Sequence, residues 1–566
     1  MSFSPELSAL GASALLRRRG LRWTALFEVR HHDLLGRVGR LRTRRGVVET
    51  PALLPVVNPL KQLVSPQELW EMGFRAIMVN AYLLLKSMRE EVESRGIHEV
   101  LGFEGAIMTD SGAYQLLVHG KVDTTPEEIV EFQVKAGSDV AVILDVPTGY
   151  PASRSVAEAT VDETLRRARA LFSLDRGEAL WVGPVQGGAW LNLVERCARE
   201  MASLPFDLHA LGSPTRVMEQ YLFDLLVDML AAAKPHLPLS RPLHLFGAGH
   251  PMMFSLAVAL GCDLFDSASY ALYARQGRYM VDHGTLRAES LKYLPCSCAV
   301  CSKLTVEELR EMPRVEAERA LAKHNLYVCL AELKRVKQAI VEGRLWELLE
   351  ARSRSHPSMG AALRKLRELT PLLEAGTPIS KPKGAFFHDA SSMHRPEAYR
   401  FRRRVKERLS FNHRKLLLLI PPPPSKPYTR SKAVKRALKE LHEVLKDELS
   451  LIEICVYATP LGLVPLELDE VYPASQHEAP RGLEVEAEGV SASEVADLID
   501  SGGFEAVVYL HLPRLRGLVH DAALKACLER GLGFKAYSPK ASPWSPRSLK
   551  ELASLVGELL KKAKEA

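Results

Sequence analysis

The sequence predicts an α/β protein: a parallel (β/α)8 barrel of the TIM type, followed by smaller α+β domains. Three observations lead to this prediction. Eight short apolar runs alternate with helical patterns between residues 52 and 270, which fits a parallel eight-stranded barrel. The runs are apolar on both faces, as expected of strands that helices cover. A glycine- and proline-containing stretch at 374–384 separates a second part with a different pattern. An open doubly wound sheet remains the alternative for the first part.

Each apolar run ends abruptly in a polar or glycine-rich loop, which is typical of strands in a parallel barrel. In chain order the runs are ALLPVV (52–57), RAIMVNAY (75–82), GAIMTDSG (105–112), DVAVILDVPT (139–148), LWVGPVQGG (180–188), FDLHALGS (206–213), PLHLFGAG (242–249) and DLFDSASY (263–270). Between them, stretches such as TPEEIVEFQVKAG (125–137) and SVAEATVDETLRRARALFSL (155–174) have the periodicity of helices.

The remainder of the chain is helical and charged up to about residue 370, and then changes in character. After the linker EAGTPISKPKG (374–384), the pattern gives a basic helical stretch (397–415), the run LLLLIPPPPSKPY (416–428) and a helix to about 447. Two strand-like runs (452–459 and 504–512) and a final Lys/Glu-rich helix (548–564) follow. We therefore expect a catalytic domain over 1–370 and a C-terminal region over 371–566.

Composition places the chain among ordinary globular proteins that stay in the cytoplasm. Of its 566 residues, 47% are hydrophobic and 25% charged, and a net charge of +7 permits a polyanionic partner. Arginine-rich runs occur at 17–22, 37–45 and 400–415. The most apolar run, Leu416–Ile420, is too short to cross a membrane and ends in prolines. Eight cysteines in this length indicate a reducing compartment and no disulfide scaffold.

Three cysteines and one histidine have the pattern of a zinc site. Cys296, Cys298 and Cys301 follow C-x-C-x2-C spacing, and His324 comes after a helical stretch. Thiolates and imidazole suit a tetrahedral zinc ion. Four protein ligands would close its coordination shell, whereas a catalytic zinc keeps one position open for water. The sequence thus predicts a structural zinc subdomain after the last barrel strand; a chance cluster of buried thiols is the alternative.

If the zinc is structural, the chemistry must lie elsewhere, and two aspartates are the candidates. Asp110 and Asp266 each follow a predicted strand, as do Asp145, Gln186 and Ser213. The carboxyl ends of barrel strands meet at one face, where active sites are built. Paired carboxylates suit reactions through oxocarbenium-like transition states, in which one attacks carbon and the other moves protons. Taken singly, an Asp beside Ser and Gly is more often a helix cap or turn residue.

At these residues the sequence resembles the tRNA-guanine transglycosylases, and specifically their archaeal branch, the 7-cyano-7-deazaguanine (archaeosine) tRNA-ribosyltransferases. The matching stretches are TPALLPVVNP (50–59), MVNAYLLLK (78–86), MTDSGAYQL (108–116), ILDVPT (143–148), VQGG (185–188), FDSASYALYARQGRYM (265–280) and PCSCAVC (295–301), and the resemblance covers about 25–330. It implies a (β/α)8 barrel with a structural zinc. It also implies exchange of guanine 15 in the tRNA D arm for 7-cyano-7-deazaguanine, through an aspartyl-ribosyl intermediate, as an early step of archaeosine biosynthesis.

The resemblance also assigns roles by position. Asp266 would attack ribose C1′, and Asp110 would act as general acid and base or hold the leaving base; which of the two attacks stays open. Asp145 would read the base, because a carboxylate can accept two N–H groups from a guanine-like edge. The other residues implied in substrate binding are Ser111, Gln186, Gly187, Gly212, Ser213 and Phe246. Ser213 departs from the small apolar residue expected there, which puts recognition of the nitrile in doubt.

The C-terminal region departs from its relatives at specific positions. PPPPSKPYTRS (421–431) resembles a motif of archaeosine synthase, but Pro422 takes the place of its cysteine and Val434 that of its histidine, so lysine transfer is not expected. The region would instead present basic surface to tRNA phosphates. No RNA-binding PUA pattern is recognisable, so either tRNA docks without such a domain or a separate PUA-domain protein supplies it as a partner. The other expected partners are tRNA, guanine, 7-cyano-7-deazaguanine and a second copy in a homodimer.

Three other functions remain open from the sequence. The chain could be a degenerate relative that binds tRNA without exchanging a base, or a protein similar to archaeosine synthase that acts at another step. It could also be a barrel glycosidase or metal hydrolase acting on small substrates. The intact aspartate pair and the full zinc set favour the transglycosylase over the first two, and release of guanine from tRNA separates it from the third.

Overall fold

The computed structural model describes residues 25–113, 123–411 and 413–565, and it divides into two compact units. The first unit comprises residues 1–341 and 348–365, and the second comprises 342–347 and 366–566. The arginine-rich run at 17–22 lies outside the described residues. Each unit has its own sheet and core and is described separately below.

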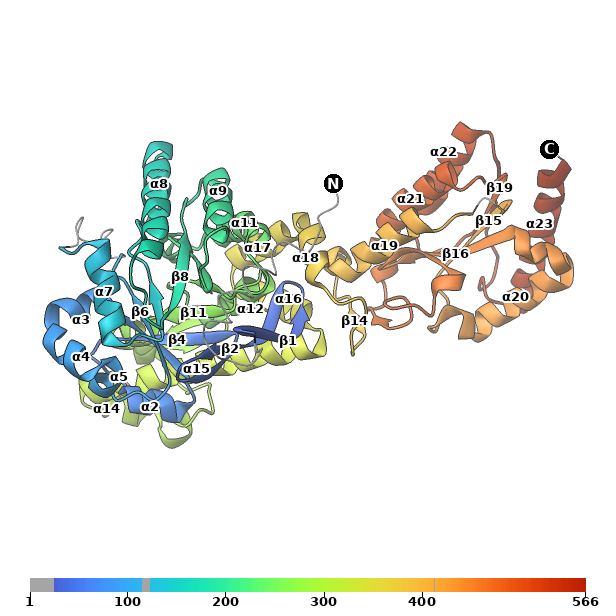
Figure 1. The fold of residues 1–566 in the computed structure, drawn as a ribbon. Coiled ribbons are helices and arrows are strands. Elements are labelled where there is room, and N and C mark those ends of the chain that lie inside the picture. Colours follow the sequence, from blue (N-terminus) through green and yellow to red (C-terminus); the bar gives the residue numbers. More distant parts are fainter. Residues whose placement is uncertain (1–24, 114–122, 412, 566) are drawn as a thin grey trace. The chain divides into compact units, whose positions relative to one another are not determined.

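The first unit is built on a closed parallel barrel of eight strands, which confirms the predicted fold class (Figure 1). The strands are β4 (Ala52–Val57), β5 (Ala76–Asn80), β6 (Ala106–Asp110), β7 (Val140–Val142), β8 (Leu180–Val185), β9 (Leu208–Leu211), β10 (Leu243–Leu245) and β11 (Leu264–Ser267). Each predicted run contains one of them. The order around the barrel follows the chain from β4 to β11, and β11 pairs with β4 to close it. The open doubly wound sheet is therefore excluded for this unit.

Helices cover the outside of the barrel, as the apolar strand sequences require. They are α2 (Pro66–Met72), α3 (Ala81–Ser87), α4 (Arg89–Arg95), α5 (Ile97–Leu101), α7 (Pro126–Ala136), α8 (Arg154–Ala170), α9 (Leu191–Ala202), α10 (Thr215–Glu219), α11 (Phe223–Ala233), α12 (Phe254–Ala259) and α13 (Ser269–Arg275). Local sequence sets their ends: Thr125 caps α7, whose first residue is Pro126, and Gly137 in the left-handed region stops it.

A small antiparallel sheet closes one mouth of the barrel. It consists of β1 (Phe27–Asp33), β2 (Gly36–Thr43) and β3 (Gly46–Thr50), which precede the first predicted strand. Phe27, Leu41 and Val48 belong to the same core cluster as Ala76 and Ala106, which are the first residues of β5 and β6. The sheet therefore plugs the amino-terminal end of the barrel and leaves the carboxyl-terminal end for a site.

The last part of the first unit is mostly helical. The hairpin β12 (Arg278–Val281) and β13 (Gly284–Arg287) follows the barrel, and α14 (Val306–Glu311), α15 (Arg314–Glu342), α16 (Leu345–Ser353) and α17 (Pro357–Glu368) come after it. A capping box between Thr305 and Glu308 starts α14. The long helix α15 buries His324 and Asn325, and the Asn325 carboxamide oxygen accepts a hydrogen bond from the backbone N–H of Met280 at 2.9 Å. This contact fixes α15 to the hairpin.

The second unit is a layered structure around a five-stranded sheet. Its strand order is β17-β16-β15-β19-β20, and all neighbours are parallel except the pair β16–β17. The strands are β15 (Leu416–Ile420), β16 (Ile452–Thr459), β17 (Gly462–Pro465), β19 (Ala506–Leu510) and β20 (Gly533–Tyr537); β14 (Ala385–Phe386) and β18 (His477–Glu478) form a separate pair. The helices are α18 (Thr370–Gly376), α19 (Pro396–Arg408), α20 (Lys432–Leu445), α21 (Leu483–Ser501), α22 (Leu518–Arg530) and α23 (Pro546–Glu565).

Alternate residues of the central strand β15 belong to two different cores. Leu416, Leu418 and Ile420 pack with residues of α20 and α23, whereas Leu417 and Leu419 pack with residues of α21 and α22. This alternation follows from the period of two in a strand, and it explains why the run is apolar at every position.

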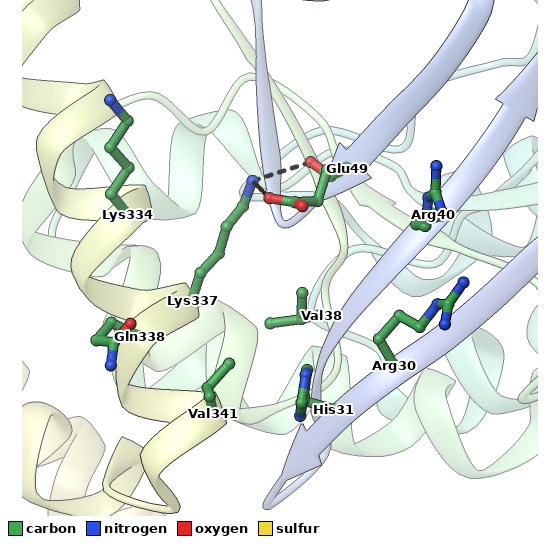
Figure 2. A pocket seen from close by; sticks show the side chains of 9 residues that line it. All are labelled: Arg30, His31, Val38, Arg40, Glu49, Lys334, Lys337, Gln338 and Val341. Carbon is green, nitrogen blue, oxygen red and sulfur yellow. Dashed lines mark hydrogen bonds and ion pairs between the residues drawn. The ribbon is translucent and has the colours of Figure 1, made fainter.

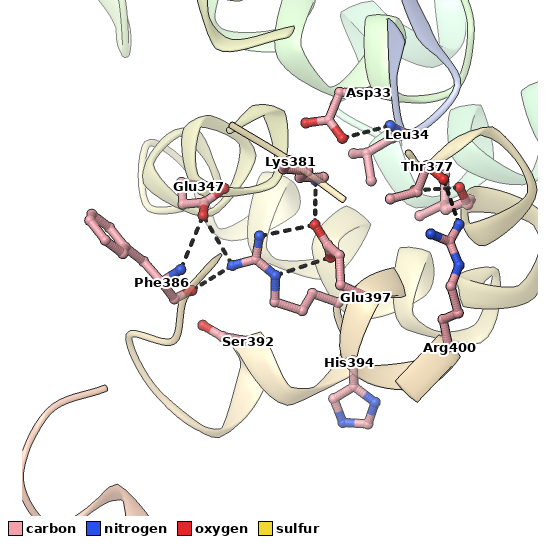
Figure 3. A network of polar contacts seen from close by, with 12 residues as sticks. Asp33, Leu34, Glu347, Thr377, Lys381, Phe386, Ser392, His394, Glu397 and Arg400 are labelled. Carbon is pink, nitrogen blue, oxygen red and sulfur yellow. Dashed lines mark hydrogen bonds and ion pairs between the residues drawn. The ribbon is translucent and has the colours of Figure 1, made fainter. Parts of the chain in front are cut away.

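A buried ion-pair network fixes the start of α19 in the second unit (Figure 3). The Arg395 guanidinium donates to Glu397 Oε2 at 3.1 Å and to Glu347 Oε1 at 3.0 Å, and Lys381 pairs with Glu397. All four side chains are at least 90% buried. These charged side chains can be buried because each charge has a partner of opposite sign and the guanidinium also donates to the Phe386 carbonyl. Lys381 lies within the predicted linker, so that part of 374–384 is packed into the unit.

Candidate active site and metal centre

The predicted site residues converge at the open mouth of the barrel. Asp110 is the last residue of β6 and Ser111 follows it; Asp145 comes shortly after β7; Gln186 and Gly187 follow β8; Gly212 and Ser213 follow β9; Phe246 follows β10; and Asp266 lies near the end of β11. Because all eight strands are parallel, these carboxyl ends meet at one face. The structure thus brings together residues from six strands that are separated by up to 156 positions in the chain, from Asp110 to Asp266.

Asp110 is partly buried and lies near other carboxylates. Its Oδ2 accepts a hydrogen bond from the Asn80 side-chain amide at 3.1 Å. Burial, together with the negative charges of Asp266 and Asp145, raises the pKa of Asp110 to about 7. A carboxyl group with this pKa holds its proton for part of the time at neutral pH, which suits a general acid that later acts as a base.

Asp145 and Gln186 form an oriented hydrogen-bonded pair. The Gln186 amide nitrogen donates to Asp145 Oδ2 at 2.5 Å, and its carbonyl oxygen accepts from the Ser213 hydroxyl at 2.7 Å and from the Thr148 backbone N–H at 3.1 Å. The Gln186 side chain is therefore held in one orientation. Burial raises the pKa of Asp145 to about 6 even though the bond from Gln186 lowers it. Asp145 is ionised above that pH and can then accept N–H groups.

Gly187 and Gly212 are required at the site because other atoms of the protein lie too close to their Cα atoms to leave room for a side chain. A Cβ on Gly212 would lie 2.2 Å from the Gln186 amide nitrogen, and one on Gly187, whose φ is +139°, would lie 2.6 Å from the Val194 backbone nitrogen. Ser213 has a φ of +61°, and its hydroxyl accepts from the Gly149 N–H at 3.1 Å while donating to Gln186. The Ser213 side chain is thus engaged in supporting the site, which accounts for a polar residue at this position.

Asp266 is held by a neighbouring strand and turn. Its Oδ1 accepts from the Gly247 N–H at 2.9 Å, and His244 Nε2 lies 2.9 Å from the same oxygen. His244 belongs to β10 and was not identified from the sequence; the only signal was a polar residue in an otherwise apolar strand. Phe246 packs against the barrel core, and its ring meets that of His244 edge to face at 4.9 Å.

The hydroxyl of Ser111 stands out among the polar groups at this mouth. Ser111 is fully buried directly after Asp110, and within the described part of the chain its Oγ has no hydrogen-bond partner. A buried polar atom without a partner is costly and is often completed by a bound molecule. Ser111 is therefore suited to contact a substrate.

The four predicted metal ligands come together in the first unit. One ligand atom from each of Cys296, Cys298, Cys301 and His324 lies within 4.8 Å of the other three. His324 Nδ1 lies 3.6 Å from Cys298 Sγ and 3.3 Å from Cys301 Sγ. These separations are close to those between ligands of one tetrahedral ion. The donor set of three thiols and one imidazole fits a metal ion and is compatible with zinc.

Groups around the cluster orient the histidine. His324 Nε2 lies 2.9 Å from the Met280 carbonyl oxygen, which can only accept, so Nε2 carries the proton and Nδ1 presents its lone pair to the thiols. The Tyr279 ring stacks on the His324 ring at 3.6 Å, and its hydroxyl lies 3.2 Å from Cys301 Sγ. A metal here would join the segment 296–301 to α15 and β12.

Among the described residues, no helix is long and apolar enough to span a membrane.

The sequence matches the family profile described as queuine tRNA-ribosyltransferase over residues 33–358. A second profile, a domain of unknown function, matches residues 398–556.

Curated relatives match most of the chain, and each is named a tRNA-guanine(15) transglycosylase. The protein of Aeropyrum pernix is 45% identical over 84% of this chain and 92% of its own length. Those of Methanocaldococcus jannaschii and Methanosarcina mazei are each 42% identical over 84% of this chain, and over 71% and 92% of their own lengths. The profile match covers the whole barrel and the metal cluster, and these relatives extend it into the second unit. The chain therefore belongs to the queuine tRNA-ribosyltransferase family of tRNA-modifying enzymes.

Proposed function

We propose that this protein is a tRNA-guanine(15) transglycosylase that exchanges guanine in the D arm of tRNA for 7-cyano-7-deazaguanine, an early step in archaeosine biosynthesis. One observation carries the proposal: Asp110, Asp145 and Asp266 converge at one barrel mouth, and the charges of the other two help to raise the pKa of Asp110. The relatives' printed names support the position of the exchanged base. Such an enzyme works where tRNA is, in the cytoplasm.

In the first half of the proposed reaction, Asp266 displaces guanine. Its carboxylate forms a bond to ribose C1′ while the bond between C1′ and N9 of guanine breaks, and the electrons of that bond leave with the base. Protonated Asp110 donates its proton to the departing guanine. Burial and the neighbouring charges that raise the pKa of Asp110 to about 7 favour this role.

In the second half, the incoming base reverses these steps. Asp110, now ionised, takes the N9 proton of 7-cyano-7-deazaguanine as N9 bonds to C1′ and the ester to Asp266 breaks. Asp110 ends protonated and Asp266 ends ionised, so the cycle closes without a further reactant. Two displacements at C1′ retain the configuration of the glycosidic bond.

Base recognition is assigned to the groups around Asp145. The ionised Asp145 carboxylate would accept N–H groups of the guanine-like edge, and the carbonyl of Gln186 is already fixed by the protein. A base without matching donors would leave the buried carboxylate unpaired, so discrimination should be strong. Ser111, Gly187, Gly212, Ser213 and Phe246 complete the proposed pocket, with Phe246 as a surface for the flat heterocycle.

The metal is proposed to be a structural zinc held by Cys296, Cys298, Cys301 and His324. A zinc ion with four protein ligands has no open position for substrate, so what it supplies is cross-linking of the chain. None of the four ligands lies on the barrel strands that carry the carboxylates. The residues of this centre therefore position α15 and take no part in the displacement.

Label release over a range of pH tests the proposed function. We expect the wild-type protein to release guanine from tRNA labelled at position 15 when 7-cyano-7-deazaguanine is present. kcat/KM should fall below about pH 6, where Asp145 becomes protonated and stops accepting, and above about pH 7, where Asp110 loses the proton it must donate. Initial rates of release between pH 5 and pH 9 measure both limbs.

Other outcomes of this assay identify the alternatives. Tight tRNA binding without release would indicate a degenerate relative or an enzyme of another modification step. Hydrolysis of simple glycosides without any need for tRNA would indicate a barrel glycosidase. Release that stays constant up to pH 9 would argue against Asp110 as the acid.

Two partners are proposed from the family resemblance alone. A homodimer is testable by sedimentation of the purified chain. A separate PUA-domain protein would supply RNA-binding surface, and an unchanged tRNA affinity after adding such a protein would contradict it.

A basic groove at the plugged end of the first unit is proposed to contact the tRNA backbone (Figure 2). It encloses about 430 Å³ between the sheet β1–β3 and α15, and its cations are Arg30, Arg40, Lys334 and Lys337. Lys337 donates to Glu49 Oε1 at 2.8 Å, while the Lys334 side chain extends away from the other lining groups. Excess positive charge in a groove attracts phosphates without reading sequence.

Reversing two of these charges should weaken tRNA binding. For Arg40→Glu with Lys334→Glu we expect roughly tenfold weaker binding and a salt dependence shallower by about one unit per cation. Exchange at saturating tRNA should be unchanged, because the groove borders the closed end of the barrel. The control, Arg95→Glu with Lys135→Glu on α4 and α7, makes the same change in net charge. Equal weakening by both pairs, measured by fluorescence anisotropy, would contradict a local contact.

A further inference from the structure

The environment of the Asp266 carboxylate is asymmetric. Both contacts to it, from the Gly247 N–H and from His244 Nε2, are to Oδ1, each at 2.9 Å. No hydrogen bond to Oδ2 is present among the described residues. The two carboxylate oxygens therefore differ in their surroundings before any substrate arrives.

His244 is an unusual residue for the interior of a barrel strand. It is fully buried, and although Nε2 faces Oδ1, the imidazole is not aligned for a straight hydrogen bond, so neither ring nitrogen has a hydrogen-bond partner in the described part of the chain. A buried polar group in this state is costly and calls for an explanation. In enzymes without substrate, catalytic hydrogen bonds are often poorly aligned and tighten when the substrate binds.

The turn after β10 is shaped to bring its amide to the carboxylate. Gly247 has a φ of +70°, and a Cβ there would lie 2.7 Å from Thr215 Oγ1. A Cβ on Gly249 would lie 2.1 Å from the Ser267 Cβ, so this turn packs directly against the end of β11. The strand register agrees with the contact between His244 and Asp266. His244 pairs with Leu264 on the adjacent strand, and Asp266 lies two residues after Leu264, on the same face of that strand.

We propose that His244 is a positioning residue which, with the Gly247 amide, holds Oδ1 of Asp266 so that Oδ2 is the atom that attacks ribose C1′. The inference rests on the proposed transglycosylase function and assigns one further residue to that site. His244 touches neither substrate nor base in this assignment; it acts through Asp266.

The assignment accounts for both half-reactions with one fixed carboxylate. When Oδ2 bonds to C1′ and guanine leaves with the proton of Asp110, Oδ1 becomes the carbonyl oxygen of the ester. A carbonyl oxygen still accepts hydrogen bonds, so Gly247 keeps its partner in the intermediate and His244 Nε2 can donate to the same oxygen. When the new base displaces Oδ2, the carboxylate is regenerated in place. No rotation of Asp266 is needed between the steps, which preserves the geometry of attack.

Two substitutions at His244 separate positioning from mere packing. His244→Phe keeps a ring of similar shape without donors, and His244→Gln retains an N–H near the place of Nε2. We expect His244→Phe to slow single-turnover guanine release on the order of 10- to 100-fold, because misplacement of a reacting group has effects of that size. Its tRNA dissociation constant should stay within about twofold, and His244→Gln should recover most of the rate.

His209 on β9 provides the matched control. It is also buried in a barrel strand, but its ring neighbour is Phe206 and not a carboxylate. His209→Phe should leave the single-turnover rate of the folded protein unchanged. Equal rate losses in His244→Phe and His209→Phe, or no rescue by His244→Gln, would overturn the assignment.

A crystal structure of the trapped wild-type intermediate provides a test that needs no variant. We expect the ester to use the Asp266 oxygen turned away from Gly247, with the carbonyl oxygen facing the Gly247 N–H and His244. An ester on the oxygen nearest His244 would refute the inference while leaving the transglycosylase function intact. A wild-type protein that releases no guanine and forms no adduct would instead remove the proposed function, and the inference with it.

Discussion

Asp266→Asn should abolish the release of guanine from tRNA. The neutral amide cannot displace a base from C1′, so we expect the rate to fall by at least about 10⁴-fold, as for loss of other enzyme nucleophiles. The substitution keeps size and shape, and its side-chain oxygen can still accept from Gly247, which donates at 2.9 Å in the wild type. Fold and tRNA affinity should therefore be nearly unchanged. Single-turnover release of labelled guanine measures the effect.

Asp110→Asn is the companion variant that separates the two roles. Without the acid, guanine leaves slowly, but Asp266 can still form the covalent bond, so an adduct between protein and tRNA should accumulate slowly and be detectable on denaturing gels. Asp266→Asn should give no adduct at all. An adduct in Asp266→Asn and none in Asp110→Asn would reverse the roles and make Asp110 the nucleophile.

Cys298→Ser should prevent metal binding at the cluster of Cys296, Cys298, Cys301 and His324 and destabilise the first unit. Structural zinc sites bind with apparent free energies on the order of 10 kcal/mol, and that energy is available for folding. In this protein the ion would hold the segment 296–301 against α15 through His324. We expect about one zinc per chain in the wild type, a strongly reduced content in the variant and a melting temperature lower by several degrees.

A buried thiol away from the cluster controls for loss of a cysteine. Cys527 lies in α22 of the second unit and is fully buried, so Cys527→Ser should keep the zinc content of the wild type. Metal analysis and thermal melting distinguish the two variants. If a chelator abolished exchange at once while the melting temperature stayed constant, the metal would be catalytic and the structural assignment would be wrong.

The barrel could be predicted from the sequence because each strand is recognisable from a short run of neighbouring apolar residues. Each of the eight apolar runs contains one strand, since a strand covered by helices must be apolar on both faces. Once the strands are known to be parallel, residues such as Asp110 and Gln186 must reach the same mouth, whatever their separation in the chain. The metal cluster was also predictable from a local pattern, because Cys296, Cys298 and Cys301 lie close together in the sequence. A helix between them and His324 is enough to bring that histidine to the same place.

Local patterns could not reveal contacts that depend on register and packing between distant segments. The plug β1–β3 was not assigned, because its role becomes visible only when Phe27, Leu41 and Val48 enter the barrel core. The architecture of the second unit likewise could not be predicted, because it depends on the order of the strands in the sheet, in which β15 lies between β16 and β19.

The sequence by itself therefore determined the fold class, the family and the set of candidate ligands and carboxylates, because these follow from residue type, spacing and periodicity. Only the tertiary structure decided how those groups act on one another. The position of His244 beside Asp266 comes from the pairing of β10 with β11, and the raised pKa of Asp110 comes from burial beside two carboxylates from other strands. Both depend on charged groups and hydrogen-bond donors lying within a few ångströms of one another. Residues that are distant in the sequence come that close only after the chain has folded.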